Sequence, residues 1–283
     1  MRYTPARVKP LSAVTLAAAL ATHGAARADA QTLPLRTEPA VTAPGGTLVL
    51  ETAMEAIADE PSYVTGVERT RWDGPLLRLV YSPAANVELD VEWVAWVGVL
   101  GEEGRGDFQS WDWGDVALRA KWRIHEGKGG HPTIGARFGV VLPQTSFEDV
   151  HFNPLGLGPN TVRAFVEGLL TQPVGRARIH VDAGLFIQDE VYHLHDQRDF
   201  VSYGLAFEWP ARSHLVLLAE VAGRAGDGRP GADQSSEARA GVRLGGGRVR
   251  WDLALRRGLA KADGTWGLSL GFTWTARAPA GRP

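Results

Sequence analysis

Acidic and basic residues alternate with apolar ones in two successive segments of the chain. Residues 87–99 hold three carboxylates at every second position and residues 115–124 hold three cations in the same spacing: Glu88, Asp90, Glu92, Arg119, Lys121 and Arg123. Side chains two positions apart share one face of a strand. Paired antiparallel, the two sets could form a ladder of cross-strand ion pairs, or charged rungs that give a pore its selectivity. Both interpretations stay open.

Later segments repeat this design. The charged positions on the same kind of face are Arg137, Arg163, Glu167, Arg178, His180, Asp182, Arg239, Arg243, Arg250, Asp252 and Arg256. Arginine dominates the set, and guanidinium groups bind carboxylates in a two-point geometry. We therefore expect an interior wall that favours anionic or carboxylated solutes, provided that enough arginines remain unpaired.

Catalysis finds weaker support in the sequence. Ser269, His180 and Asp182 can be named as a Ser/His/Asp set, but a triad needs its nucleophile and base within hydrogen-bond reach, and no nucleophile motif surrounds any serine. The glycine-rich residues 223–231 and 245–247 lack the Lys-Ser/Thr of a phosphate loop. We expect no enzyme activity and no cofactor.

A metal site is the other chemistry to consider. His193, His195 and Asp196 supply imidazole and carboxylate groups, which suit transition metals. Two histidines in a polar loop are more often simply solvated than coordinated, because a structural site usually needs four ligands. We therefore expect no metal.

The element that positions the wall residues is clearest in residues 161–188, which form two alternating segments around a turn at 173–176. One face is apolar and the other carries charge, and each segment has about the ten residues that a tilted membrane strand needs. Similar alternation predicts ten further strands: 47–56, 76–82, 87–99, 115–124, 133–142, 200–209, 214–222, 236–244, 248–256 and 265–274. The strand at 214–222 is the least regular, because it is apolar on both faces.

The connections between these strands alternate between long and short, as they do in bacterial outer-membrane barrels. An even strand number returns the chain to the side of the short turns, which face the periplasm. The sequence therefore predicts an all-β fold: a transmembrane antiparallel up-and-down β-barrel of about 12 strands, with both termini periplasmic. Aromatic residues at outward positions near the short turns predict a membrane-interface ring: Tyr81, Trp122, Trp209, Trp251 and Trp274.

The N-terminus has the pattern of a secretory signal. Arg2, Arg7 and Lys9 precede an apolar run at 11–21, and small residues at 28 and 30 suit cleavage. We expect a signal peptide at 1–30, a periplasmic lead-in at 31–46, the outer-membrane barrel at 47–274 and a periplasmic tail at 275–283. The remaining chain is net acidic, which argues against a nucleic-acid partner, and it contains no cysteine.

The chain also resembles a known family. The residues are Gly114-Asp115-Val116-x-Leu118-x-Ala120-Lys121-Trp122-Arg123, then Gly135-x-x-x-Gly139, Val141-Leu142-Pro143 and Leu155-Gly156-Leu157-Gly158. They resemble the bacterial outer-membrane family named for the meta-pathway of phenol degradation, often labelled simply transporter. The resemblance covers residues 74–274 and implies an outer-membrane barrel that moves small, often aromatic, compounds. This chain departs from the family's pattern after Pro143 and in the nine residues that follow Trp274.

Strand number bears on function, because eight-stranded barrels are filled by side chains whereas sixteen-stranded ones leave an aqueous channel. Twelve strands predict a narrow lumen, with the loop at 143–160 as a constriction. We expect passive passage of small solutes, aromatic or anionic ones among them, with outer-membrane lipid and the barrel-assembly machinery as partners. The alternatives are a non-conducting barrel with a structural or surface-binding role, and an exported soluble β-protein.

Overall fold

The computed structural model describes residues 33–61, 68–101, 109–144, 161–189, 197–226, 234–260 and 263–277. Its strands are β1 (Thr47–Pro61), β2 (Glu68–Ala84), β3 (Val87–Val94), β4 (Val97–Gly101), β5 (Gln109–Asp112), β6 (Val116–His125), β7 (Thr133–Leu142), β8 (Arg163–Val174), β9 (Ala177–Asp189), β10 (Gln197–Arg212), β11 (Leu215–Gly226), β12 (Ser235–Gly246), β13 (Val249–Gly258) and β14 (Trp266–Arg277). Within the described ranges, no helix has the length and apolar character of a membrane span.

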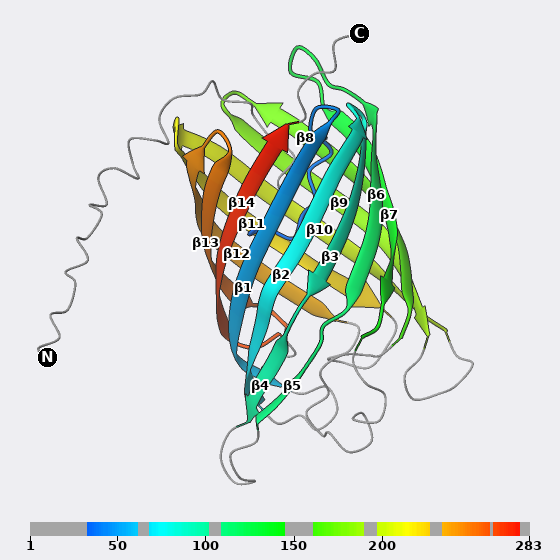
Figure 1. Cartoon of the computed structure of the whole chain (residues 1–283), viewed down its shortest axis with the longest axis vertical. Coiled ribbons are helices and arrows are strands. Elements are labelled where there is room, and N and C mark those ends of the chain that lie inside the picture. Colours follow the sequence, from blue (N-terminus) through cyan, green and yellow to red (C-terminus); the bar gives the residue numbers. More distant parts are fainter. Residues whose placement is uncertain are drawn as a thin grey trace, which may run out of the picture.

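The strands form one antiparallel sheet that closes on itself, because β1 pairs with β14 on one side and with β2 on the other (Figure 1). β2 pairs with both β3 and β4, so these two segments are one barrel strand with a break at residues 95–96. β5 and β6 likewise follow one another, with a break at residues 113–115. The barrel therefore has twelve strands, which confirms the predicted all-β antiparallel barrel, while the periplasmic position of the termini stays a prediction.

The hairpin of β8 and β9 shows why the chain folds this way. Val166 lies opposite Leu185 on the outer face. The charged residues that alternate with such apolar residues along both strands face inward. Gly175 makes the tight turn with a positive φ of 59°, which glycine adopts without a steric penalty. Alternation and turn chemistry thus agree on the same register.

One end of the barrel has two-residue turns after β2, β8, β10 and β12, and we call it the short-turn end. The opposite end, with the connections that follow β1, β7, β9 and β11, is the long-loop end. β1 begins and β14 ends at the short-turn end, where Thr47 pairs with Arg277. The chain therefore enters and leaves the barrel on the same side.

Several strands extend beyond their predicted limits. β1 and β2 continue as a hairpin as far as the pair of Pro61 with Glu68, whereas the sequence predicted a loop from residue 57 to residue 75. This extension is charged rather than alternating, with Arg69 3.0 Å from Glu60 in an ion pair, so the period of two could not reveal it. β14 runs three residues into the predicted tail, to Arg277.

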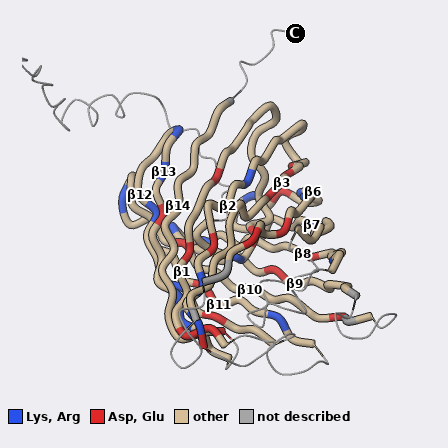
Figure 2. The backbone as a smooth tube through the Cα atoms, turned by 60° about the horizontal axis from the view of Figure 1, so that its bottom comes forward, with Lys and Arg blue, Asp and Glu red and all other residues tan. Residues whose placement is uncertain are grey.

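The outer surface of the barrel is apolar on nearly every strand. Leu205, Val166 and Leu255 are each more than half exposed there, together with many other aliphatic and aromatic side chains. Acidic and basic positions are interspersed around the barrel rather than gathered on one side (Figure 2). Most of the charged residues on the barrel strands are buried or half-buried, although they lie in a sheet only one layer thick. Their side chains therefore point into the barrel interior.

Candidate functional site in the barrel interior

Residues 33–46, which we call the interior segment, lie inside the barrel rather than outside it. The segment starts near the short-turn end, where the Leu33 carbonyl accepts a hydrogen bond from Arg243, and it returns there, where Ala43 N donates to Glu88. Between these points it crosses to β8, where Ala40 N donates to Thr171 Oγ at 2.9 Å. This placement corrects the prediction of a periplasmic lead-in for these residues.

Carboxylates of the wall take the place of a neighbouring strand for this segment. The backbone N–H groups of Arg36 and Thr37 donate to Glu220, and that of Glu38 donates to Asp182 at 2.7 Å. Buried backbone donors need such partners, because an unpaired N–H away from water is costly. The segment is therefore held by specific hydrogen bonds and not only by packing.

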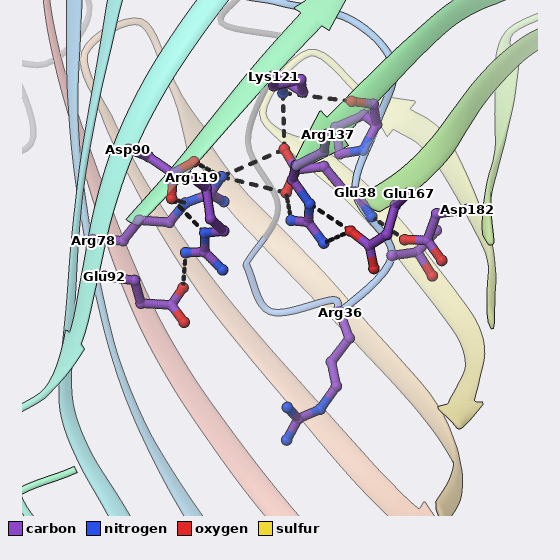
Figure 3. Close-up of polar contacts among 12 residues, drawn as sticks. Arg36, Glu38, Arg78, Asp90, Glu92, Arg119, Lys121, Arg137, Glu167 and Asp182 are labelled. Carbon is purple, nitrogen blue, oxygen red and sulfur yellow. Dashed lines mark hydrogen bonds and ion pairs between the residues drawn. The ribbon is translucent and has the colours of Figure 1, made fainter. Parts of the chain in front are cut away.

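Glu38 is the main electrostatic anchor of the interior segment. Its carboxylate lies 2.8 Å from Lys121 Nζ, 2.8 Å from Arg137 Nη1 and 3.3 Å from Arg78 Nη2 (Figure 3). The side chain is fully buried, and three strands, β2, β6 and β7, supply its partners. A single carboxylate thus joins the segment to a cationic sector of the wall.

The ionisation of Glu38 follows from this arrangement. Burial alone would raise the pKa of its carboxyl group, but Arg78, Lys121 and Arg137 together hold that pKa well below its usual value. A lowered pKa in the folded state stabilises the fold at pH values above the unfolded pKa of about 4.3, and the contribution is lost only as pH falls toward the folded value. The anchor therefore stays charged at neutral and mildly acidic pH.

The acidic and basic sets of β3 and β6 face one another in register. Glu88 lies opposite Lys121 and Asp90 lies opposite Arg119, and the two ion-pair distances are 2.5 Å and 2.7 Å. Glu92 also pairs with Arg119, at 2.5 Å. The cross-strand ion-pair ladder is therefore present, while the role of these charges in solute selectivity stays a prediction.

The other predicted wall residues are brought into further ion pairs. The pairs are Arg137 with Glu167, Arg163 with Asp115, Arg178 with Glu208, Arg243 with Glu208 and Asp252, and Arg239 and Arg256 with Glu237. Arg123 donates to the Ala85 carbonyl at 2.9 Å, and Arg250 lies half-buried opposite Thr273. Most wall arginines thus contact carboxylates of the protein itself.

The candidate Ser/His/Asp residues are engaged elsewhere. Ser269 Oγ donates to Glu55 at 3.0 Å, and His180 Nδ1 lies 2.9 Å from Thr171 Oγ. Asp182 accepts from the backbone of the interior segment. These contacts give each side chain a structural partner. His193, His195 and Asp196 lie outside the described residues, as does most of the loop at 143–160.

The five predicted interface aromatics are exposed on the outer surface near the short-turn end. The structure adds a second exposed group toward the long-loop end, which consists of Trp72, Trp111, Trp113 and Trp266. Trp113 also stacks on Trp93, with ring centroids 5.4 Å apart. The sequence contained a signal for this group, since tryptophan recurs five times between residues 72 and 113.

Apolar contacts support the interior segment at its beginning. Leu35 packs in a buried cluster with Ala206 of β10 and Leu218 of β11, and Val216 packs against that cluster. These wall residues face inward, where an aqueous lumen would favour polar groups. The predicted strand at 214–222, observed as β11, is apolar on both faces, and this pattern was therefore the sequence signal for an internal segment.

Gly204 of β10 allows the segment to approach the wall closely. A Cβ atom at this position would lie 2.5 Å from Thr37 Oγ, closer than real Cβ contacts allow. Ala40 and Ala43 of the segment are themselves fully buried. The interior segment therefore fits the wall at specific positions.

Comparisons with known proteins add to this picture. No family model and no curated protein matches the chain. Among solved structures, the chain is similar to an outer membrane channel from Pseudomonas putida F1, with 14% identity and a TM-score of 0.64 over 83% of this chain and 97% of that one. The chain has the fold of an outer-membrane β-barrel. It is also similar to the NanC porin, with 7% identity and a TM-score of 0.51 over 82% of this chain and all of that one.

Proposed function

We propose that this protein is an outer-membrane channel that gives small solutes passive passage through a narrow charged lumen, constricted by the interior segment. The observation that supports it most is the division of the barrel into an apolar outer face and a charged interior. This division suits a barrel with lipid outside and a polar path inside. The resemblance to the transporter family agrees with it.

The orientation belongs to the same proposal. The short-turn end faces the periplasm, because outer-membrane barrels have their short turns there, and both termini then lie on that side. The signal sequence delivers the chain to the periplasm, and the assembly machinery inserts the barrel into outer-membrane lipid. The two exposed aromatic groups then lie at the two membrane interfaces.

A second candidate is a barrel that does not conduct and acts as a structural or surface-binding protein. The interior segment favours it, because Glu38, Ala40 and Ala43 are fully buried inside the barrel. The ion pairs of the wall further reduce the number of charges available to a solute. The two candidates differ in whether solutes pass at all.

Solute passage is the test that separates them. We expect proteoliposomes with the full-length mature protein to take up glycerol and acetate slowly and to exclude sucrose, because the interior segment leaves only a narrow path. The measurement is liposome swelling, with protein-free liposomes as the control. Swelling rates equal to the control for every solute, in the wild type and also after Glu38→Gln substitution, would contradict the channel and favour the second candidate.

A further inference from the structure

Arg36 differs from the arginines of the wall in its exposure. Its side chain is 55% exposed, whereas the ion-paired arginines on the described strands are between 2% and 27% exposed. It stands where the interior segment turns across the barrel, and its guanidinium points away from the cluster around Glu38 (Figure 3). Arg36 therefore presents an accessible cation inside the barrel.

The contacts of Arg36 hold it in place without covering it. Its Nε donates to Glu237 at 2.7 Å, while its Nη2 lies 3.4 Å from Glu55. Glu55 has closer partners, since Arg239 Nη2 lies 2.7 Å away and Ser269 Oγ donates to it at 3.0 Å. An incoming carboxylate can therefore replace Glu55 at Arg36 without leaving Glu55 unpaired.

An apolar strip lies on the wall nearby. Phe165, Phe186 and Phe200 are directly opposite one another on β8, β9 and β10, and their stacked rings have centroids 4.7 Å and 5.0 Å apart. All three face the interior, and Phe186 is only half-buried. Such a strip offers apolar and aromatic contact within an otherwise charged wall.

The strand register places this strip two strands away from Glu237, which holds Arg36, and nearer to the long-loop end. Arg224 of β11 has its guanidinium carbon 5.4 Å from the Phe200 ring centroid, and it is the diagonal neighbour of Glu237, which holds Arg36. Two strand spacings and four residues along the strands, together about 16 Å, separate the backbones of Phe200 and Glu237. The side chains of Arg36 and of the phenylalanines extend inward from the two ends of this distance, so a ligand with an apolar body and one carboxylate can reach both.

We infer that Arg36 and the Phe165–Phe186–Phe200 strip form a binding site for amphipathic monocarboxylates. The carboxylate pairs with Arg36, and the apolar body lies along the phenylalanine rings. The site faces the long-loop end, so an incoming solute meets it before the rest of the interior segment. This inference rests on the proposed function and names the class of solute that the channel selects.

Equilibrium binding tests the site independently of conduction. We expect the full-length mature protein in nanodiscs to bind 4-phenylbutyrate in isothermal titration calorimetry, after subtraction of empty nanodiscs. Arg36→Gln should weaken binding about tenfold or more, because a charge-assisted two-point contact is lost. Phe186→Ala should weaken it about fivefold, through lost aromatic contact.

The controls separate a specific site from general attraction. Arg176→Gln removes another exposed arginine, at the β8–β9 turn, and should leave the affinity unchanged. The neutral probe 4-phenylbutanol should bind more weakly to the wild type and should not respond to Arg36→Gln. Heat-modifiable gel mobility confirms that each variant is folded.

Three results would overturn the inference: no binding of 4-phenylbutyrate at millimolar concentration, equal affinity of wild type and Arg36→Gln, or equal affinity for the neutral probe. None of these binding results bears on whether solutes pass through the barrel in the liposome-swelling experiment. Loss of swelling with intact binding would instead count against the channel. The two proposals can therefore fail separately.

Discussion

Replacing Glu38 by glutamine should open the barrel. Glutamine keeps the shape of the side chain but removes the charge that Arg78, Lys121 and Arg137 surround. Removing one partner of a buried ion pair costs about 3–5 kcal/mol of stability. We expect a cost near the lower value, because each of the three cations keeps a carboxylate partner on the wall. A loss of about 3 kcal/mol raises the population of the displaced segment by more than a hundredfold. Single-channel recording in planar bilayers should show correspondingly more frequent large openings.

The matched control is Glu167→Gln. Glu167 is also buried, but its partners Arg137, at 2.5 Å, and Ser202 both belong to the barrel wall and not to the interior segment. We expect this variant to lose stability and to keep the small conductance of the wild type. Equal opening in both variants would show that a general weakening of the wall, and not release of the segment, increases conductance.

Placing arginine at the middle of the outer face should strongly impair insertion. Leu205 of β10 is 54% exposed, and it lies between Val181 and Val221 on the neighbouring strands. An arginine facing lipid at the bilayer midplane costs about 2–4 kcal/mol. Leu205→Arg should therefore lower the free energy of unfolding in lipid vesicles by this amount. With an unchanged m-value, the urea concentration at the midpoint of unfolding falls by the lost free energy divided by that m-value.

Val174→Arg is the comparison for this substitution. Val174 is exposed to a similar degree, 51%, but it lies at the β8–β9 turn, outside the expected hydrocarbon region. The cost there should be about 0–1 kcal/mol. If both variants unfolded at the wild-type urea concentration, the apolar surface would not be in contact with lipid.

The sequence was sufficient for the strands that alternate cleanly. β8 and β9 lie within two residues of their predicted limits, because apolar and charged positions alternate without interruption and a glycine turn separates them. The third predicted strand, at 87–99, was less regular. There the ring of Trp96 covers Gly98, where a Cβ would lie 2.5 Å from Trp96 Cζ2, and the strand breaks into β3 and β4.

The path of the interior segment could not be predicted from the pattern of its own residues. Its stabilising contacts join residues far apart in the chain, such as Thr37 with Glu220 and Glu38 with Asp182, and they use backbone N–H groups that every non-proline residue has. The same applies to the arginines of the wall. Alternation placed them on one face, but their partners depend on strand register and on Glu38, which lies outside every predicted strand.

The position of the interior segment can be tested directly with a cysteine pair, because the chain contains no other cysteine. A Cβ at Gly135 would lie 3.6 Å from the Cα atom of Ala40 and 3.0 Å from its nearest neighbour, the Trp122 carbonyl oxygen, so Ala40→Cys and Gly135→Cys bring two thiols within disulfide reach. We would measure the conductance of this pair in the Glu38→Gln background, oxidised and then reduced. We predict only the small conductance of the wild type when the pair is oxidised, and frequent large openings after reduction. Frequent openings in the fully oxidised protein would contradict the claim that this segment controls passage.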